Sequence, residues 1–266
     1  MTGWIVYDRQ GAARNEWFIS SFIQTAGRYG VDLSLKVVSG FDDFTGVSLP
    51  DFAIVRTIAP QINKFFEEKG VPVFNNYQTS KIANDKWQTY QLCKELGIPV
   101  MKTELLVNGA PTLSFPFVLK SLNGHGGSEV FLIRNRQVLD ERLSTIDESN
   151  FLAQEFCSCP GKDMRVYVLG KEIVCGVLRS SQTDFRSNFS LGGEVCVCEV
   201  SSKQKEVICK LQKTLGFDLV GVDFIFHEGE WVLNEIEDVV GTRMLYGCTD
   251  INIVDLYMRH ILSRLS

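Results

Sequence analysis

Residues 221–241, GVDFIFHEGEWVLNEIEDVVG, have the pattern of a β-hairpin with an acidic face. Apolar and polar residues alternate on both sides of a short polar turn, and the two arms carry Asp223, Glu235 and Glu237. Residues two apart on a strand share a face, so Glu235 and Glu237 point the same way. An odd-numbered loop, Glu228–Glu230, predicts that Asp223 pairs opposite Glu235 and joins them.

Two interpretations fit this acidic face. Three carboxylates on one face repel one another unless a cation lies between them. Ligation by a few carboxylate oxygens suits Mg²⁺ that also binds nucleotide phosphates. An edge hairpin whose acidic face is simply solvated fits the same residues equally well. The rest of the chain has to distinguish between them.

Length and composition limit the class of protein. The chain has 266 residues, enough for two or three lobes, and its net charge of −5 argues against non-specific nucleic-acid binding. We expect a cytoplasmic protein without a membrane partner, because no apolar run is long enough to span a bilayer and the chain opens on a strand-like WIVYD instead of a signal peptide. The 8 cysteines form no C-x-x-C pair and are expected to be reduced thiols.

The first 76 residues alternate strand-like and helix-like segments. Strands are expected at 4–8, 33–38, 52–56 and 71–74, and helices at 15–29 and 61–69. This alternation predicts a small parallel sheet, and the absence of a G-x-G-x-x-G turn argues against a dinucleotide site there. Arg9, Arg14 and Arg56 follow strand ends, where open α/β sheets contact ligands. Ordinary surface arginines fit these positions equally well.

Residues 115–133 have the pattern of two strands joined by a glycine-rich loop. Gly124, Gly126 and Gly127 would let backbone N–H groups approach phosphate oxygens closely, and Lys120 at the base of the loop can supply a point charge. The loop leads into a strand and lacks G-K-[ST], so it is not a P-loop. Taken alone, the pattern favours a hairpin tip with a solvated lysine.

Two segments flank this hairpin. Before it, a helix capped by Thr79 or Ser80 is expected to run to Leu96. After it, a strand ends in Glu155 and Phe156. Such a strand end suits an adenine, because the backbone can bind the base edge and the apolar ring can form a wall. Glu155 or a nearby acid is then a candidate ligand of the ribose hydroxyls.

Arginines follow in the next predicted hairpin and loop. Asp163 and Arg165 share one face of a strand, Arg179 lies on the returning arm, and Arg186 and Asn188 fall in an irregular polar loop. Arginines that face carboxylates and a glycine loop are what phosphoryl transfer needs, because arginine stabilises the charge spread over the transferring group. The alternative is an ion-pair network in which Asp163 binds Arg165 or Arg179.

From about Asp51 to Gly241 the chain resembles the ATP-grasp superfamily, and within it the RimK-like carboxylate–amine ligases. The matching motifs occur in the family's order and are Asn84-Asp85-Lys86, opening a helix that ends in Leu-Gly-Ile-Pro99, Phe117-Val-Leu-Lys120 with the glycine loop, Gln154-Glu155-Phe156, Gly161-Lys-Asp163-Met-Arg165, Asp184-Phe-Arg186-Ser-Asn188 with Gly192-Gly193, and Asp223 with Glu235-Ile-Glu237. The resemblance implies an α/β (α+β) fold of three lobes with nucleotide held between the second and third. The lobes are expected at 1–76 (small parallel sheet), 77–153 (glycine-rich loop) and 154–266 (metal site).

The resemblance also implies roles for individual residues. ATP would contact Lys86, Lys120, Gly124, Gly126, Gly127, Glu155, Phe156 and Asp163. Two Mg²⁺ ions, for which Mn²⁺ is an acceptable substitute, would be held by Asp223, Glu235 and Glu237. Arg186 and Asn188 would lie at the γ-phosphate and substrate, Arg179 is added as a candidate for stabilising the transferring phosphoryl group, and Arg165 is assigned to the substrate.

Two departures from the family pattern concern the metal and substrate side. The family usually has Glu-x-Asn where this chain has Glu235-Ile-Glu237. A third carboxylate binds Mg²⁺ more strongly by charge, but it cannot donate a hydrogen bond as an amide can. The family's following Pro-Gly segment is here Asp238-Val-Val-Gly241, and Arg243 just beyond it is a candidate for holding a substrate carboxylate.

The activity that the resemblance implies is ligation. ATP would phosphorylate a carboxylate, and an amine would attack the resulting acyl phosphate, with ADP and phosphate as products. The expected partners are an amino-acid or carboxylate substrate and an amine acceptor, which includes a peptide or protein terminus, and a homodimer is compatible with the sequence. The alternative is a nucleotide-binding regulatory or partner subunit without catalysis, which Glu237 keeps open.

Overall fold

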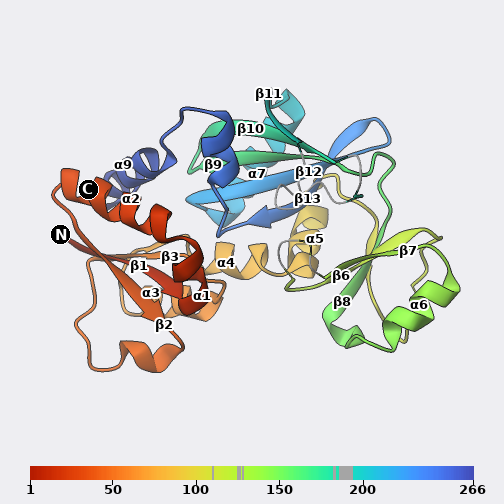
Figure 1. Ribbon diagram of the computed structural model, residues 1–266, viewed down its shortest axis with the longest axis horizontal. Coiled ribbons are helices and arrows are strands. Elements are labelled where there is room, and N and C mark those ends of the chain that lie inside the picture. Colours follow the sequence, from red (N-terminus) through yellow and green to blue (C-terminus); the bar gives the residue numbers. More distant parts are fainter. Residues whose placement is uncertain (110, 125–126, 128, 182–183, 186–193) are drawn as a thin grey trace.

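The computed structural model describes residues 1–109, 111–124, 127, 129–181, 184–185 and 194–266, which form three sheets (Figure 1). One sheet is parallel and two are antiparallel, which confirms the mixed α/β fold class expected from the sequence. No helix in these described ranges is long and apolar enough to cross a bilayer.

The first sheet is parallel, with the strand order β2-β1-β3-β4. Its strands are β1 (Thr2–Asp8), β2 (Asp32–Val38), β3 (Phe52–Val55) and β4 (Val73–Phe74), and its helices are α1 (Arg9–Arg14), α2 (Glu16–Arg28), η1 (Phe41–Phe44) and α3 (Pro60–Glu68). Helices on its faces bury both sides of the sheet, which is why β3 consists of four apolar, buried residues in succession. The parallel sheet predicted from the alternation of segments is therefore confirmed.

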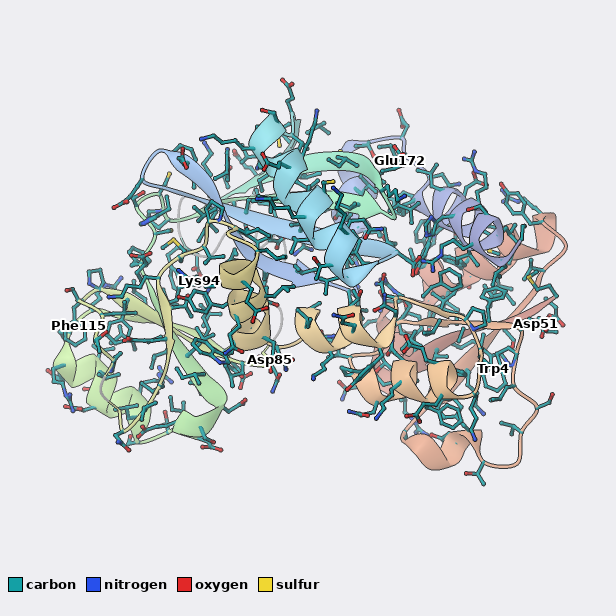
Figure 2. All side chains as sticks on the ribbon, turned by 180° about the vertical axis from the view of Figure 1, so that it is seen from behind. Trp4, Asp51, Asp85, Lys94, Phe115 and Glu172 are labelled. Atoms are coloured by element: carbon teal, nitrogen blue, oxygen red, sulfur yellow. The ribbon has the colours of Figure 1, made fainter. Side chains whose placement is uncertain are left out.

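Two helices follow where the capping pattern predicts one, and the second begins at the Asn84-Asp85-Lys86 motif, as the family resemblance implies. The prediction of a single helix capped by Thr79 or Ser80 is wrong, because Asn76 caps the first helix and both residues are buried inside it. The Asp85 side chain then accepts two backbone N–H groups and starts a second helix. Asp85 and Lys94 mark the two ends of that second helix in Figure 2. The helices are α4 (Tyr77–Ala83) and α5 (Lys86–Glu95).

The second sheet is antiparallel, with the strand order β5-β8-β6-β7, and lies farthest from the N-terminus (Figure 1). Its elements are β5 (Thr103–Leu105), β6 (Phe117–Ser121), β7 (Val130–Ile133), α6 (Arg136–Leu143), η2 (Glu148–Asn150) and β8 (Phe151–Glu155). Leu139 of α6 packs into the same buried cluster as Phe117 and Leu119 of β6. The β6–β7 pair confirms the predicted strand–loop–strand arrangement around the glycine-rich segment.

The third sheet, with the order β11-β10-β9-β12-β13, carries the acidic hairpin. Its elements are β9 (Lys162–Leu169), β10 (Glu172–Ser180), β11 (Glu194–Cys198), α7 (Ser202–Leu215), β12 (Leu219–His227), β13 (Glu230–Glu237), α8 (Arg243–Cys248) and α9 (Ile253–Leu265). Ala83, Cys93 and Ile98, from α4, α5 and the turn after them, belong to its core. The lobe boundaries proposed at residues 76 and 153 stay a prediction.

The third sheet is fixed to the first lobe by packing and by an amide. Helix α9 lies against α2 (Figure 1), where the rings of Phe22 and Tyr257 meet edge to face with their centroids 5.7 Å apart. Asn75 lies just after β4, and its buried Nδ2 donates to the carbonyls of Leu219 at 2.9 Å and Asp238 at 3.1 Å. The segment that follows the acidic hairpin is thereby held against the first lobe.

Candidate active site between the two antiparallel sheets

The turn of the acidic hairpin has two residues. His227 pairs with Glu230, so only Glu228 and Gly229 form the turn, and their φ angles of 48° and 88° are those of a type I′ turn. The predicted three-residue loop is therefore wrong. A type I′ turn matches the right-handed twist of the two strands, and this favours the shorter connection.

A β-bulge restores the pairing that the even turn alone would lose. Phe224 pairs with Leu233, whereas Asp223 pairs with Glu235, so Asn234 is an extra residue in β13. The extra residue shifts the register by one and returns Asp223 to the position opposite Glu235. An even turn is therefore compatible with a shared acidic face in this chain.

Asp223, Glu235 and Glu237 converge at the end of the hairpin. One oxygen from each carboxylate lies within 4.8 Å of the others, and among the described residues this is the one group of three or more His, Cys, Asp or Glu side chains that is close enough to hold a metal ion. Asp223 is fully buried, and the other two are half-buried. Clustered carboxylate oxygens fit Mg²⁺, and these are the residues that would hold it.

Two arginines bridge the carboxylates on the third sheet. Arg165 binds Asp223 through Nε and Nη2, at 2.8 and 2.7 Å, and its Nη2 lies 2.6 Å from Glu237. Arg179 binds both oxygens of Asp163 at 2.6 Å, and its Nη2 reaches Asp223 at 2.7 Å. The ion-pair network that the sequence left open therefore exists, and it includes two members of the acidic cluster.

Charge and burial act differently on the three carboxylates. Burial alone would raise the pKa of Asp223, but Arg165 and Arg179 hold it down to about 2. Burial raises the pKa of Glu237 to about 7; Arg165 opposes this rise, while Asp223 and Glu235 add to it. Glu235 has no hydrogen bond or ion pair with a described residue. Glu235 is thus the carboxylate most available to a cation.

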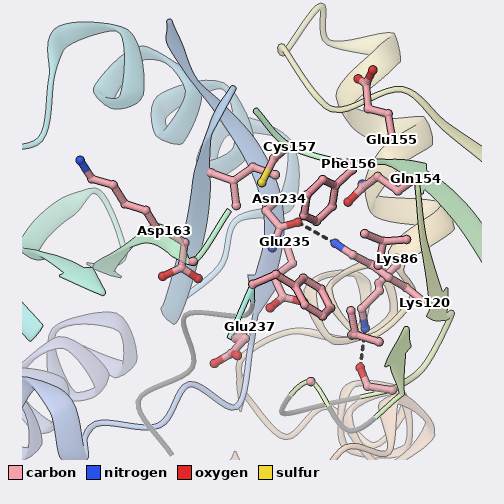
Figure 3. Close-up of a pocket in the computed structure, with 18 residues that line it drawn as sticks. Lys86, Lys120, Gln154, Glu155, Phe156, Cys157, Asp163, Asn234, Glu235 and Glu237 are labelled. Carbon is pink, nitrogen blue, oxygen red and sulfur yellow. Dashed lines mark hydrogen bonds between the residues drawn. The ribbon is translucent and has the colours of Figure 1, made fainter. Parts of the chain in front are cut away.

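Two lysines, Lys86 and Lys120, face Glu235 and Glu237 across a cavity that we call the central cleft (Figure 3). Lys120 Nζ donates to Asn234 Oδ1 at 2.9 Å, and Lys86 Nζ donates to the carbonyl of Gly124. Burial lowers the pKa of Lys120 to about 8, and Glu235 opposes this effect. The cleft is lined, among the predicted residues, by Lys86, Lys120, Gly124, Gly127, Glu155, Phe156, Asp163, Glu235 and Glu237.

The two residues predicted at the adenine differ in orientation. The carboxylate of Glu155 accepts the backbone N–H of Lys102 at 2.5 Å and lies 3.8 Å from His227 Nε2. In Figure 3 the carboxylate of Glu155 points away from Glu235, whereas the ring of Phe156 extends into the cleft. A contact of Glu155 with ribose stays a prediction.

Some of the predicted site residues lie outside the ranges that the structure describes, and the sequence prediction missed one residue of the site. Gly126, Arg186 and Asn188 lie outside the described ranges, so their roles stay predictions. Asn234 was missed because strand alternation was applied only to the three carboxylates of the hairpin. Its signal is the pair of successive polar residues, Asn234 and Glu235, between buried apolar neighbours, which is what a bulge produces.

A second cavity adjoins the central cleft, and we call it the arginine pocket. Glu237 and Asp163 lie at the cleft side of the ion-pair network, and Glu237 lines both cavities. Trp17 and Tyr246 form an aromatic wall, with ring centroids 5.0 Å apart, and Arg243 Nη2 donates to the carbonyl of Arg14 at 3.1 Å. The arginines that line the pocket are Arg14, Arg56, Arg165, Arg179 and Arg243. The two substrate candidates, Arg165 and Arg243, thus share one cavity.

The RimK-like ATP-grasp domain family matches residues 83–261 of the chain. The chain is 30% identical over 217 residues to a probable alpha-L-glutamate ligase of Haemophilus influenzae, an alignment that covers 77% of this chain and 72% of that enzyme. Among solved structures, D-alanine–D-alanine ligase from Bacillus anthracis superposes with a TM-score of 0.78 at 14% identity and covers 100% of this chain and 97% of that chain. The ATP-grasp ligase PsnB, solved with a minimal precursor, Mg and ADP, has a TM-score of 0.73 at 16% identity and covers 99% and 98%.

Proposed function

The chain belongs to the RimK-like ATP-grasp family of ligases, and on that premise we propose that it joins a carboxylate to an amine through an acyl phosphate, with ADP and phosphate as products. Ligases of this family form C–N bonds and use ATP and Mg²⁺. The proposal concerns the chemical route and the substrates.

One observation supports the proposal most directly. Glu235 and Glu237 face two lysines across a single cleft, and Asp223 lies buried behind them, with one oxygen of each of the three carboxylates within 4.8 Å of the others. Phosphates need the positive charge of Lys86 and Lys120, and a divalent cation needs the carboxylates. Mg²⁺ bound there would neutralise phosphate charge during transfer. A solvated acidic face does not account for Asp223, which is fully buried.

The proposed reaction has two steps. An oxygen of the substrate carboxylate attacks the γ-phosphorus of ATP, the bond to the β–γ bridging oxygen breaks, and ADP leaves. The amine nitrogen then attacks the acyl carbon, the bond from that carbon to the phosphate oxygen breaks, and the amine gives up a proton as inorganic phosphate leaves. The protein positions the reactants and stabilises charge, so no residue has to act as a nucleophile.

Residues of this chain have distinct roles in the proposal. Lys86 and Lys120 bind phosphates, and Arg179 stabilises the charge on the transferring group. Arg186 and Asn188 are proposed to act at the γ-phosphate and the acceptor, as the resemblance implies. The substrate carboxylate would lie where the central cleft meets the arginine pocket, beside Arg165. Mn²⁺ in place of Mg²⁺, and a homodimer, also stay proposals.

The named relative and the arginine pocket both support the proposal that the substrate is acidic. The Haemophilus influenzae relative is named a probable alpha-L-glutamate ligase. The arginine pocket carries five arginines and one carboxylate, Glu237, among its lining residues. We propose an amino-acid or dicarboxylic-acid substrate and an amine acceptor, which includes a peptide or protein terminus.

A second candidate function is nucleotide binding without turnover, in a regulatory or partner subunit. Both oxygens of Asp223 already bind arginines, and Arg165 also holds Glu237. If these ion pairs persist when nucleotide binds, Glu235 would be the one member of the cluster left without an arginine partner. Such a site would bind ATP weakly through the cation and would not support transfer.

Release of ADP and phosphate tests both candidates. A panel of carboxylic acids and amines is incubated with ATP and Mg²⁺, and the nucleotide products are separated. Ligation predicts ADP and phosphate that depend on one acid, one amine and Mg²⁺, with turnover lost in Glu235→Ala and kept in Glu230→Ala, an exposed residue of the same hairpin. AMP and pyrophosphate would contradict the acyl-phosphate route, whereas ATP binding without turnover would favour the second candidate.

A further inference from the structure

Arg56 is a buried cation that no carboxylate of the described residues contacts, although the buried carboxylate of Asp238 acts on it electrostatically from a distance. The side chain of Arg56 is 7% exposed, and it forms no ion pair with any described residue. Nη2 donates to the carbonyl of Val240 at 2.7 Å, the guanidinium lies 5.3 Å from the centroid of the Phe18 ring, and Nε has no hydrogen-bond partner. A buried charge without a contacting counter-ion is costly, so the fold retains this arginine against a penalty.

The position of Arg56 in the fold points to a ligand. Arg56 directly follows β3, at the carboxyl end of a parallel strand, which is where open α/β sheets bind ligands. It also lines the arginine pocket, whose far end is formed by Arg165 and Arg179 beside the acidic cluster. An anion in this pocket would supply the direct ion pair that no described carboxylate, Asp238 included, forms with Arg56.

Charge balance within the pocket supports the same conclusion. Arg165 and Arg179 are neutralised by Asp223, Asp163 and Glu237. The remaining three arginines of the pocket have no ion pair with a described residue and are Arg14, Arg56 and Arg243. The pocket therefore has an excess of positive charge at the end away from the acidic cluster.

We propose that Arg56 is a specificity-determining residue that holds a second carboxylate of the substrate, so that the ligase selects acids with at least two carboxylate groups. The inference rests on the proposed function and deepens it. One carboxylate lies beside Arg165, where transfer takes place, and the other lies against Arg56, with Arg14 and Arg243 at the mouth of the pocket. An acid with one carboxylate would leave Arg56 without a direct ion-pair partner.

Arg142 provides a matched control. Its guanidinium also lies over a phenylalanine, 4.0 Å from the centroid of the Phe131 ring, and its Nε also lacks a hydrogen-bond partner. It belongs to α6 in the second lobe and lines neither the central cleft nor the arginine pocket. Replacing Arg142 thus removes a similar cation and stacking contact without changing the proposed substrate site.

The test is calorimetric binding of small acids to the protein without nucleotide, with glutarate as the dicarboxylate probe and butyrate as the monocarboxylate probe. We expect the wild type to bind glutarate at least about ten-fold more tightly than butyrate. Arg56→Gln should lower the affinity for glutarate about 10- to 100-fold, which corresponds to the loss of one or two hydrogen bonds to a charged group. Arg56→Gln should change the affinity for butyrate little, and Arg142→Gln should leave the affinities for glutarate and butyrate unchanged. Arg56→Lys keeps the charge, so it should retain part of the preference for glutarate.

Several outcomes would overturn the inference. Equal affinity of the wild type for glutarate and butyrate would do so, as would no binding of glutarate, or unchanged glutarate binding in folded Arg56→Gln. If Arg56→Gln does not fold, the test rests on the wild type's preference for glutarate and on Arg56→Lys. The inference is contradicted if Arg56→Lys weakens the binding of glutarate and of butyrate by the same factor. Product analysis separates this inference from the ligase proposal. ADP release with monocarboxylic acids as efficient as with dicarboxylic acids contradicts the role of Arg56 alone, whereas no ADP with any pair contradicts the ligase alone.

Discussion

Arg165 Nη2 lies 2.6 Å from Glu237 Oε1, so the residue that departs from the family's Glu-x-Asn pattern is held by an arginine that also binds Asp223. A neutral asparagine could not form that ion pair. The carboxylate at position 237 therefore adds a charge to the acidic cluster and at the same time ties it to the arginine pocket. The effects of this carboxylate on metal binding and on substrate binding can be measured separately in substituted proteins.

Glu237→Asn restores the family residue and removes one negative charge. We expect the Mg²⁺ concentration needed for ADP binding to rise about ten-fold, because fewer carboxylates remain to hold the cation. The melting temperature should change little, since 29% of the side chain is exposed and Arg165 keeps Asp223 as its partner. Mg²⁺ titration of ADP binding by calorimetry measures the effect. An unchanged Mg²⁺ requirement would remove Glu237 from the proposed metal site.

Arg179→Gln tests the centre of the ion-pair network. Arg179 is 4% exposed and binds Asp163 and Asp223, so its removal takes one arginine contact from each of two buried carboxylates. We expect unfolding to become easier by about 3–5 kcal/mol, as is typical when one member of a buried pair is removed. Chemical denaturation measures this free energy.

Lys203→Gln is the matched comparison for Arg179→Gln. Lys203 forms an ion pair with Glu230 at 2.6 Å, but its side chain is 79% exposed. Exposed pairs contribute about 0–1 kcal/mol, so this variant should unfold almost like the wild type. A loss of less than about 1 kcal/mol in Arg179→Gln as well would mean that the buried network is not a stabilising element.

Sequence patterns were sufficient for the parallel first sheet, the β6–β7 pair and the two hairpins β9–β10 and β12–β13 of the third sheet, because strands and amphipathic helices have distinct periodicities. They failed at two local features. The break between α4 and α5 depends on the side chain of Asp85, and the even turn depends on a bulge at Asn234. In each case a polar side chain or one extra residue, which periodicity does not weigh, decided the outcome.

The site itself was predictable only in part. The clustering of Asp223, Glu235 and Glu237 followed from strand alternation and a correct pairing, although the predicted loop was wrong. The choice of partners within the network depends on three-dimensional distances, so the sequence left open whether Asp163 binds Arg165 or Arg179. Arg56 could be placed at a strand end, but its burial and its lack of a contacting carboxylate among the described residues are not visible in a sequence.

Deleting Asn234 tests the bulge. Without this residue, the two-residue turn leads directly to a regular pairing of Asp223 with Glu235, so the acidic cluster should survive. Lys120 loses its hydrogen-bond acceptor, and we expect ADP to bind about five- to ten-fold more weakly at an unchanged Mg²⁺ requirement. Asn234→Ala keeps the bulge and should lower the affinity for ADP to a similar extent. A lost Mg²⁺ requirement in the deletion variant alone would mean that the bulge itself positions the carboxylates.

Nucleotide affinity should depend on pH through Lys120. Burial lowers the pKa of Lys120 to about 8 from its ordinary 10.5, so its ammonium is charged below about pH 8 and becomes neutral above it. Phosphate binds the charged form. The affinity for ADP should therefore be constant below pH 8 and fall as the pH rises beyond it, by up to about ten-fold per pH unit until the pKa in the complex is reached.

Two substitutions at position 120 separate this effect from general alkaline loss of structure. Arginine stays protonated over the whole range, so Lys120→Arg should bind ADP with an affinity that does not fall between pH 8 and 10. Lys120→Met has no charge to lose, so its affinity should be low and equally independent of pH. Calorimetric titrations of ADP from pH 7 to 10 compare the three proteins. A fall in affinity above pH 8 that is equally steep in Lys120→Arg would assign the titration to another group and leave Lys120 without a role in binding phosphate.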